Sequence, residues 1–147
     1  MKKYKFKLNA LLKVRKLKEE TCKMDIGRIR VKITELTSEI EKQNEGIRDA
    51  YESQEKGLEK GMSGQELQFH PYFVRGKSAN IKMLQLEIEQ LETEATFKYA
   101  ELKILRANTK VIEKMKDKDF QKHKKEVSKK QFQEIEEQAQ NWKQFIK

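Results

Sequence analysis

The sequence contains few of the residues that build disulfides, metal sites and tight loops. Its 147 residues include one cysteine (Cys22), one proline (Pro71) and two histidines (His70 and His123). A single cysteine excludes an internal disulfide, and this usage indicates a reducing cytoplasm. One cysteine and two distant histidines form no ligand cluster, so no metal is expected.

Long apolar runs are also missing. No stretch approaches the roughly 20 apolar residues that span a bilayer, so we expect no direct membrane insertion. The N-terminus is basic, but Asn9 and Lys13 interrupt its apolar residues, which argues against a signal peptide.

The composition favours a coiled coil. Charged residues make up 39% of the chain and apolar residues 36%, which is too charged for a thick globular core. Apolar residues step by three and four along a first seam, as heptads require. This seam comprises Ile26, Ile29, Ile33, Leu36, Ile40, Gln43, Ile47 and Ala50. It predicts a first helix over about 8–59.

A break follows, since three glycines and the single proline fall within fifteen residues: Gly57, Gly61, Gly64 and Pro71. Glycine ends or loosens helices and proline lacks a backbone donor, so the turn is placed at about 60–71. Within it, Ser63 with Glu66 three residues later forms a weak capping motif for a short helical turn.

A second seam follows Gly76 and predicts a helix over about 72–127, with Ser78 as a candidate N-cap. Its members are Ile81, Leu84, Ile88, Leu91, Ala95, Lys98, Leu102, Leu105, Thr109 and Ile112. A last helical segment is expected over about 130–146. Its apolar residues are Phe132, Ile135, Ala139, Trp142 and Ile146.

Two long helices with a short connection pack most simply as an antiparallel all-α coiled-coil hairpin in a single domain. A turn centred near residue 66 makes facing positions sum to roughly 132, so Cys22 would face about residue 110 and Leu8 would lie near 120–124. The alternative is one continuous helix that dimerises, and the Gly/Pro cluster argues against it.

Positive charge is concentrated in two blocks. Residues 1–18 hold eight Lys/Arg and no acid, and residues 103–130 hold eleven Lys/Arg and four acids. A hairpin brings both blocks to the end that carries the termini, which predicts an acidic surface or cavity as partner. Nucleic acid is the competing reading, but few aromatics interleave with the lysines and no binding motif is evident, so no nucleic acid is expected.

No catalytic machinery is recognisable. There is no G-x-x-x-x-G-K-[ST] loop for nucleotide phosphates, and neither histidine would reach Cys22 in the hairpin. We therefore expect no enzyme activity and no cofactor. Aromatic residues instead gather beside the turn, where two helices cannot bury all of them, and exposed aromatics are typical binding anchors. The alternative is that they only cap the hairpin. The residues are Tyr51, Phe69, Tyr72 and Phe73, with Leu67 and Val74 beside them.

The chain resembles the FliJ family of the bacterial flagellar export apparatus. Three stretches carry the resemblance: the opening residues 4–15 (YKFKLNALLKVR) followed by Glu19 and Glu20; Tyr51 before the turn and Gly64, Leu67, Tyr72 and Phe73 after it; and residues 107–113 with 129–139. Each motif alone is common in coiled coils, but their order and spacing together are similar to the family.

The resemblance implies a stalk-like coiled coil that binds the hexameric export ATPase, the cytoplasmic domain of the membrane export gate, and export chaperones. It implies a cytoplasmic protein peripherally associated with the inner membrane at the flagellar base. The expected ATPase contacts are Lys5, Lys7, Lys13, Arg15, Lys16, Lys110 and Lys114. The expected gate contacts are Tyr51, Phe69, Tyr72 and Phe73, although Lys77 and Asn80 stand where the family has aliphatic residues. A generic coiled-coil scaffold or chaperone, or the stalk of a virulence secretion system, stays open as an alternative.

Overall fold

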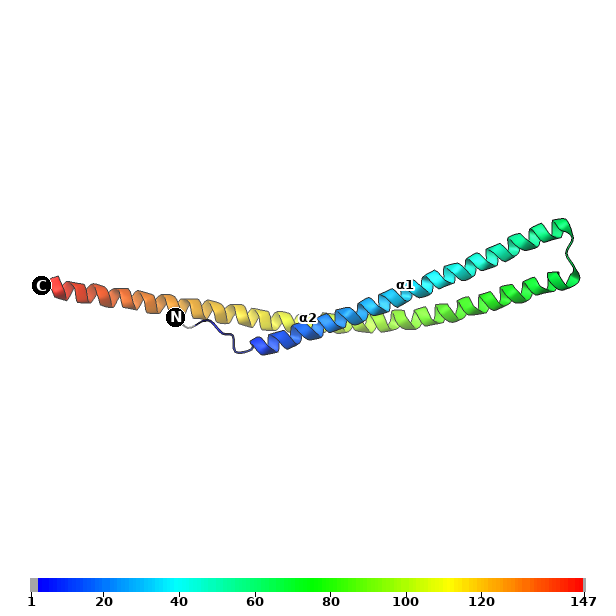
Figure 1. The fold of residues 1–147 in the computed structure, drawn as a ribbon. Helices are drawn as coiled ribbons and strands as arrows, with labels where there is room; N and C mark the ends of the chain where they lie inside the picture. The colour runs from blue at the N-terminus through cyan, green and yellow to red at the C-terminus, as the bar shows by residue number, and fades with distance from the viewer. Residues whose placement is uncertain (1–2, 147) are drawn as a thin grey trace. The chain divides into compact units, whose positions relative to one another are not determined.

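The computed structural model describes residues 3–146. Within that range the chain contains two long helices and no strand. Helix α1 spans Asn9–Lys60 (52 residues) and helix α2 spans Gly64–Ile146 (83 residues). The two helices pack against each other in opposite directions (Figure 1). The all-α, antiparallel two-helix fold predicted from the heptads is confirmed.

The connection between the helices is three residues long. Gly61 ends α1 with φ +88°, a conformation that glycine adopts without steric cost, and its N–H donates to the carbonyl of Leu58 at 3.4 Å. Ser63 then caps α2, because its Oγ accepts a hydrogen bond from the N–H of Glu66 at 3.2 Å. The weak Ser63–Glu66 motif is therefore the N-cap of the whole second helix.

The start of α2 differs from the sequence expectation. The loop covers 61–63 rather than 60–71, and Ser78 lies inside α2 instead of capping it. Pro71 costs the helix one backbone hydrogen bond, to the carbonyl of Leu67. Aromatic contacts lie on either side of Pro71: the ring centroids of His70 and Tyr51 are 4.6 Å apart, and those of Phe69 and Phe73 are 6.1 Å apart.

The chain divides into two compact units, which we call the turn unit (residues 22–101) and the terminal unit (residues 1–21 with 102–147). In the turn unit the cyan part of α1 and the green part of α2 run side by side to the loop (Figure 1). Its tightly buried residues are Cys22, Ile26, Ile29 and Ala95. No residue between 30 and 94 is buried, and seam residues such as Ile40 and Leu84 are half-buried. The seam is therefore looser toward the loop.

Polar contacts define the register of the turn unit. The Cys22 thiol donates to the carbonyl of Lys98 at 3.4 Å, and Lys98 Nζ lies 3.5 Å from Asp25 Oδ2. Arg30 contacts both oxygens of Glu92 at 3.1 Å. Cys22 thus faces Lys98, and the expectation that it faces residue 110 is wrong. The reason is the early start of α2, which moves the centre of the turn toward residue 62.

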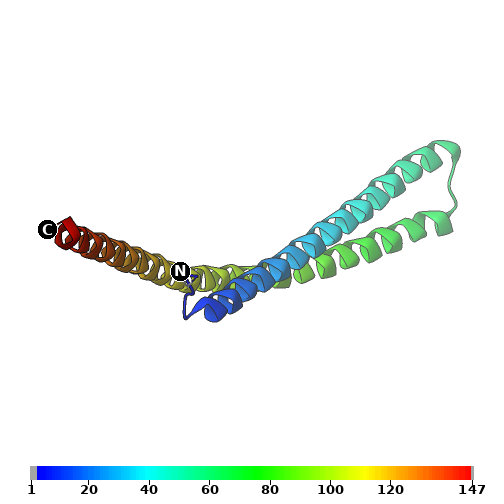
Figure 2. The same cartoon turned by 60° about the vertical axis from the view of Figure 1, so that its left-hand side comes forward.

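In the terminal unit, the first turns of α1 pack on α2 through the buried side chains of Leu12, Leu102, Thr109 and Ile112. Ion pairs border this seam, with Arg106 Nε 3.5 Å from Glu19 Oε1 and Lys16 Nζ 3.8 Å from Glu113 Oε1. α2 continues to Ile146 without a break, and its last part has no other helix beside it (Figure 2).

Neither helix, over its described residues, contains a segment long and apolar enough to cross a membrane.

Candidate functional site

A short non-helical segment precedes α1 and docks on α2 within the terminal unit through Tyr4. Residues 3–6 have no regular secondary structure, and residues 7–8 form a turn in which the N–H of Asn9 donates to the carbonyl of Phe6 at 3.1 Å. Exposure alternates along the segment: Tyr4, Phe6 and Leu8 are half-buried, whereas Lys3, Lys5 and Lys7 are exposed. The segment therefore exposes its lysines and partly shields its apolar side chains.

Tyr4 anchors this segment. Its hydroxyl donates to Asp119 Oδ2 at 2.8 Å, and its ring lies 5.1 Å from the ring of Phe120 and 5.2 Å from that of His123. Partial desolvation, followed by the hydrogen bond to Asp119 and its negative charge, raises the pKa of Tyr4. Leu8 was expected beside residues 120–124, but Tyr4 occupies that place. The reason is the early start of α2, which shifts the residues of α2 that face each position near the N-terminus.

The seven basic residues expected to contact an ATPase all lie in the terminal unit. Lys5, Lys7, Lys13, Lys110 and Lys114 are exposed. The other two are engaged within the unit. Lys16 pairs with Glu113, and Arg15 is half-buried at a seam position with its Nε enclosed and lacking a hydrogen-bond partner.

A lysine row on α2 lies outside the set of expected contacts. Lys118, Lys122, Lys125 and Lys129 are exposed and follow the i, i+4, i+7, i+11 spacing of one helix face. The spacing was visible in the sequence, but a run of lysines on a helix is usually only a solvated face.

The two units differ strongly in charge. Residues 1–21 and 102–147 hold 21 basic and 9 acidic residues, a net charge of +12. Residues 22–101 hold 12 basic and 15 acidic residues, a net charge of −3. The net positive charge of the chain thus resides in the terminal unit.

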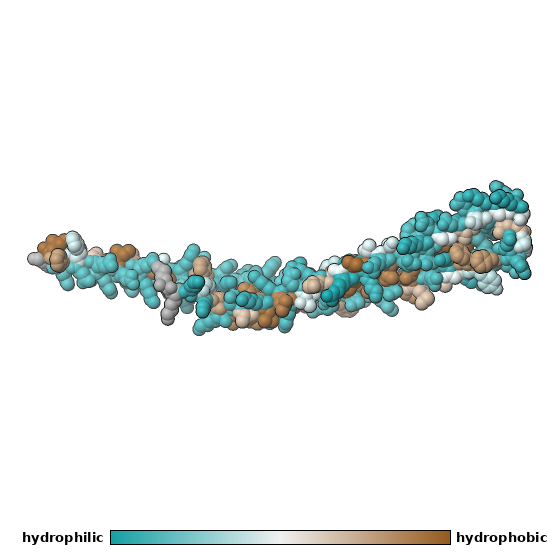
Figure 3. Space-filling view, viewed as in Figure 1, coloured by the Kyte–Doolittle hydropathy of each residue, from teal (hydrophilic) through white to brown (hydrophobic). Residues whose placement is uncertain are grey.

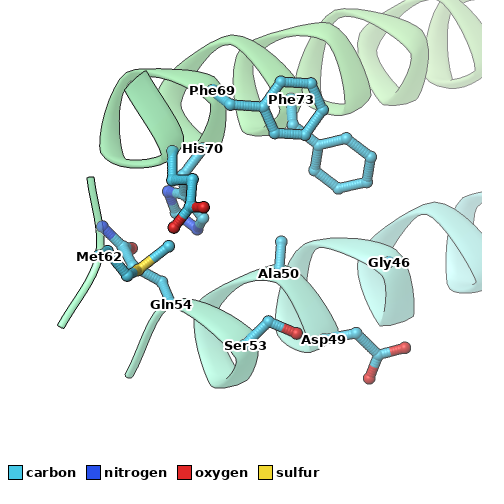
Figure 4. Close-up of a pocket in the computed structure, with 10 residues that line it drawn as sticks. Gly46, Asp49, Ala50, Ser53, Gln54, Met62, Phe69, His70 and Phe73 are labelled. Carbon is cyan, nitrogen blue, oxygen red and sulfur yellow. The ribbon is translucent and has the colours of Figure 1, made fainter. Parts of the chain in front are cut away.

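Close to the loop, the turn unit contains an open groove of about 440 Å³ between α1 and α2 (Figure 4). Its walls come from both helices and from the loop: Gly46, Asp49, Ala50, Ser53, Gln54, Met62, Glu66, Phe69, His70 and Phe73. Phe73, His70 and Ala50 point into the space between the helices (Figure 4). The groove exists because the small residues Gly46, Ala50 and Ser53 on α1 lie opposite the aromatics on α2.

The four aromatics expected at the hairpin tip have different environments. Phe69 and Phe73 line the groove, and Lys77 Nζ lies 5.4 Å from the centre of the Phe73 ring. Tyr51 stacks edge-on against His70 and is 54% exposed. Tyr72 does not line the groove and is 74% exposed. The expected patch thus combines a groove with three exposed aromatic rings, because Phe69 in the groove wall is itself 68% exposed.

The exposed apolar surface of α2 also extends beyond this patch. Met83, Leu86 and Phe97 are 69%, 59% and 73% exposed. Tyr72, Met83, Leu86 and Phe97 are separated by 11, 3 and 11 residues, which places them on one face of a helix with 3.6 residues per turn. This exposed apolar face lies outside the seam predicted for α2 and was not part of the expected patch.

Cys22 has no environment for catalysis. It is buried at the seam, and burial, with the nearby negative charge of Glu101 as a lesser cause, raises the pKa of its thiol. His70 packs on Tyr51 and His123 on Tyr4, so neither ring contacts the cysteine. No group of three His, Cys, Asp or Glu residues within 3–146 could hold a metal ion.

The chain matches the family model described as "Flagellar FliJ protein" over residues 4–144. No curated protein and no solved structure shows significant similarity to it. The family match covers the docked N-terminal segment, both helices and the loop, as the resemblance predicted. The chain therefore belongs to the FliJ family and is a component of the flagellar protein export apparatus.

Proposed function

We propose that this chain is a non-enzymatic stalk of the export apparatus, whose terminal unit binds the hexameric export ATPase. The observation that supports this most is the charge difference between the units, +12 for residues 1–21 with 102–147 and −3 for residues 22–101. A positive end favours entry into an acidic cavity, where surrounding charges focus the field and speed association.

The ATPase contact is proposed at the five exposed lysines of the expected set: Lys5, Lys7, Lys13, Lys110 and Lys114. Arg15 and Lys16 belong to the proposed site with a different role, because Lys16 pairs with Glu113 across the seam and Arg15 is half-buried within the unit. Long lysine side chains at an exposed surface mainly affect association rate and salt dependence.

The turn unit is proposed to bind the cytoplasmic domain of the membrane export gate through Tyr51, Phe69, Tyr72 and Phe73. Large exposed aromatics next to a pocket are the usual form of an interface anchor. The groove can accept an apolar side chain of the gate, while the exposed rings of Tyr72 and Tyr51 contact the gate surface around that side chain.

Binding to the gate would bring the chain to the inner membrane at the flagellar base as a peripheral cytoplasmic component. Export chaperones are proposed as a third class of partner. This part of the proposal depends on the family alone, and no residues are assigned to it.

The first test measures ATP hydrolysis by the cognate export ATPase, with and without the chain, together with the size of the ATPase oligomer. Stimulation and a shift toward hexamer are expected. No stimulation and no co-elution would remove the ATPase from the proposal.

Charge variants locate the contact. Replacing Lys5, Lys7, Lys13 and Lys110 with Gln should weaken ATPase binding at least about tenfold at low salt, and the difference should shrink as salt rises. The matched control replaces four exposed lysines of the turn unit, Lys32, Lys42, Lys60 and Lys82. Equal losses from both sets would mean that only total charge matters.

A matched pair of exposed aromatics tests the gate contact. Tyr72→Ala should weaken binding to the cytoplasmic gate domain by about tenfold or more, as for an anchor residue. Phe97→Ala removes a ring of similar exposure, 73% against 74%, outside the expected patch and should leave binding unchanged. The reverse result would move the gate contact along α2.

A further inference from the structure

The last part of α2 is a helix without a partner in the chain. Every residue from 128 to 146 is exposed. Large apolar groups are nevertheless frequent there, and Phe132, Ile135, Trp142, Phe145 and Ile146 are 62–83% exposed. Figure 3 shows these brown apolar groups on the surface near the C-terminus. A helix of this length gains little stability in water without packing, so these exposed apolar side chains favour association with another helix.

The apolar residues of this segment have the spacing of a coiled-coil seam. Steps of three, four, three and four residues separate Phe132, Ile135, Ala139, Trp142 and Ile146, which we call the C-terminal stripe. One small residue, Ala139, lies between large ones. A partner helix must therefore place a large side chain opposite Ala139 and leave room for Trp142.

An antiparallel second copy meets both requirements. When Ala139 of one copy faces Trp142 of the other, Ile135 faces Ile146 in the adjacent layers. The pairing is symmetric, so each contact occurs twice. A parallel pairing would instead place Trp142 against Trp142 and Ala139 against Ala139, with crowding in one layer and a gap in another.

Charge supports the same register. At the border of the seam, Glu136 of one copy then lies beside Lys143 of the other, which gives two attractive pairs per dimer. Sliding the copies by one heptad, so that Phe132 faces Trp142, would place Lys129 beside Lys143 and Glu136 beside Glu136. Both of those contacts are repulsive.

We propose that two copies of this chain associate through an antiparallel pairing of residues 135–146, centred between Ala139 and Trp142. The proposal is independent of ATPase and gate binding. The pairing leaves the basic block 103–130 of each copy outside the overlap, so the two positive regions do not face each other.

The test is the concentration dependence of the mass of the full chain, measured by sedimentation equilibrium. Because the overlap is short, dimerisation with a Kd on the order of 100 µM is expected. Trp142→Ala should raise the Kd at least about tenfold. Phe97→Ala, which removes an exposed ring from the turn unit, should leave it unchanged.

A charge swap tests the register itself. Glu136→Lys or Lys143→Glu alone turns two attractive pairs into two repulsive ones and should raise the Kd about tenfold. The double variant restores opposite charges and should return to within about twofold of the original Kd. A monomer up to about 1 mM, or single and double variants with the same Kd, would overturn the proposal. ATPase stimulation with these variants is measured separately, so failure of dimerisation and failure of the stalk function are distinguishable.

Discussion

Alanine substitutions along one seam should reveal that the turn unit is tightly packed in one part and loose in the other. Ile26 is 7% exposed and lies among buried neighbours, whereas Ile40 is half-buried in the stretch without any buried residue. Removing a buried isoleucine side chain costs about 3 kcal/mol through lost burial and the remaining cavity. At Ile40, where part of the side chain is already in water, we expect about 1 kcal/mol.

The difference in unfolding free energy between the two variants isolates the effect of packing. Both substitutions gain the same small helix propensity from alanine, so this contribution cancels. A difference of about 2 kcal/mol corresponds to about 4–8 °C in Tm for a chain of this size. Thermal and urea unfolding followed by helical circular dichroism would measure it, with Val31→Ala, at a 59% exposed position, as the surface control within about 0.5 kcal/mol.

Equal losses for Ile26→Ala and Ile40→Ala would refute the reasoning, because they would mean that the seam is equally packed near the loop. Hydrogen exchange offers an independent check. Amides between 34 and 90 should exchange faster than those around Ile26 and Ala95, since local opening there exposes less apolar surface.

Three further predictions concern single positions. Gly61→Ala should lower stability by about 1 kcal/mol, measured by urea unfolding, because φ is +88° there. Ser63→Ala should cost about 1 kcal/mol in the same assay through loss of the α2 cap, and Ser63→Thr, a matched cap, should cost less. The raised pKa of Tyr4 means that docking of the N-terminal segment is fully stable below pH 10 and is lost as pH rises through the raised value. Absorbance titration of tyrosinate in the native chain and in Tyr4→Phe would measure this pKa, because the difference between the two curves reports Tyr4. That difference should appear at higher pH than the ionisation of an ordinary tyrosine, and a difference curve with the ordinary tyrosine pKa would contradict the prediction.

The heptad pattern predicted both helices and the side of each that packs, because buried apolar residues must recur every three or four positions along a helix. It could not predict the register. Sliding one helix past the other by a heptad keeps apolar residues opposite apolar residues, so the loop length and polar contacts such as Arg30 with Glu92 decide between registers. The loop length depended on whether α2 could contain Pro71 and Gly76, and in the structure the helix runs through both.

The candidate sites were predictable to different degrees. The lysines of the terminal unit and the aromatics near the loop were recognisable from residue type and order. The groove was not, because it depends on Gly46 and Ala50 lying opposite Phe69 and Phe73. The docking of Tyr4 on Asp119 was equally hidden, since the two residues are 115 positions apart.

By itself, the sequence determined the helical class, the two seams, the separation of charge and the family, since all of these follow from the order of residue types along the chain. Only the tertiary structure decided which residues face each other, how tightly the seam packs and which apolar side chains stay exposed. These properties depend on the distance between the helices and on the loop that joins them. The heptad repeat does not reveal them, because it is satisfied equally by every register that keeps apolar residues opposite apolar residues.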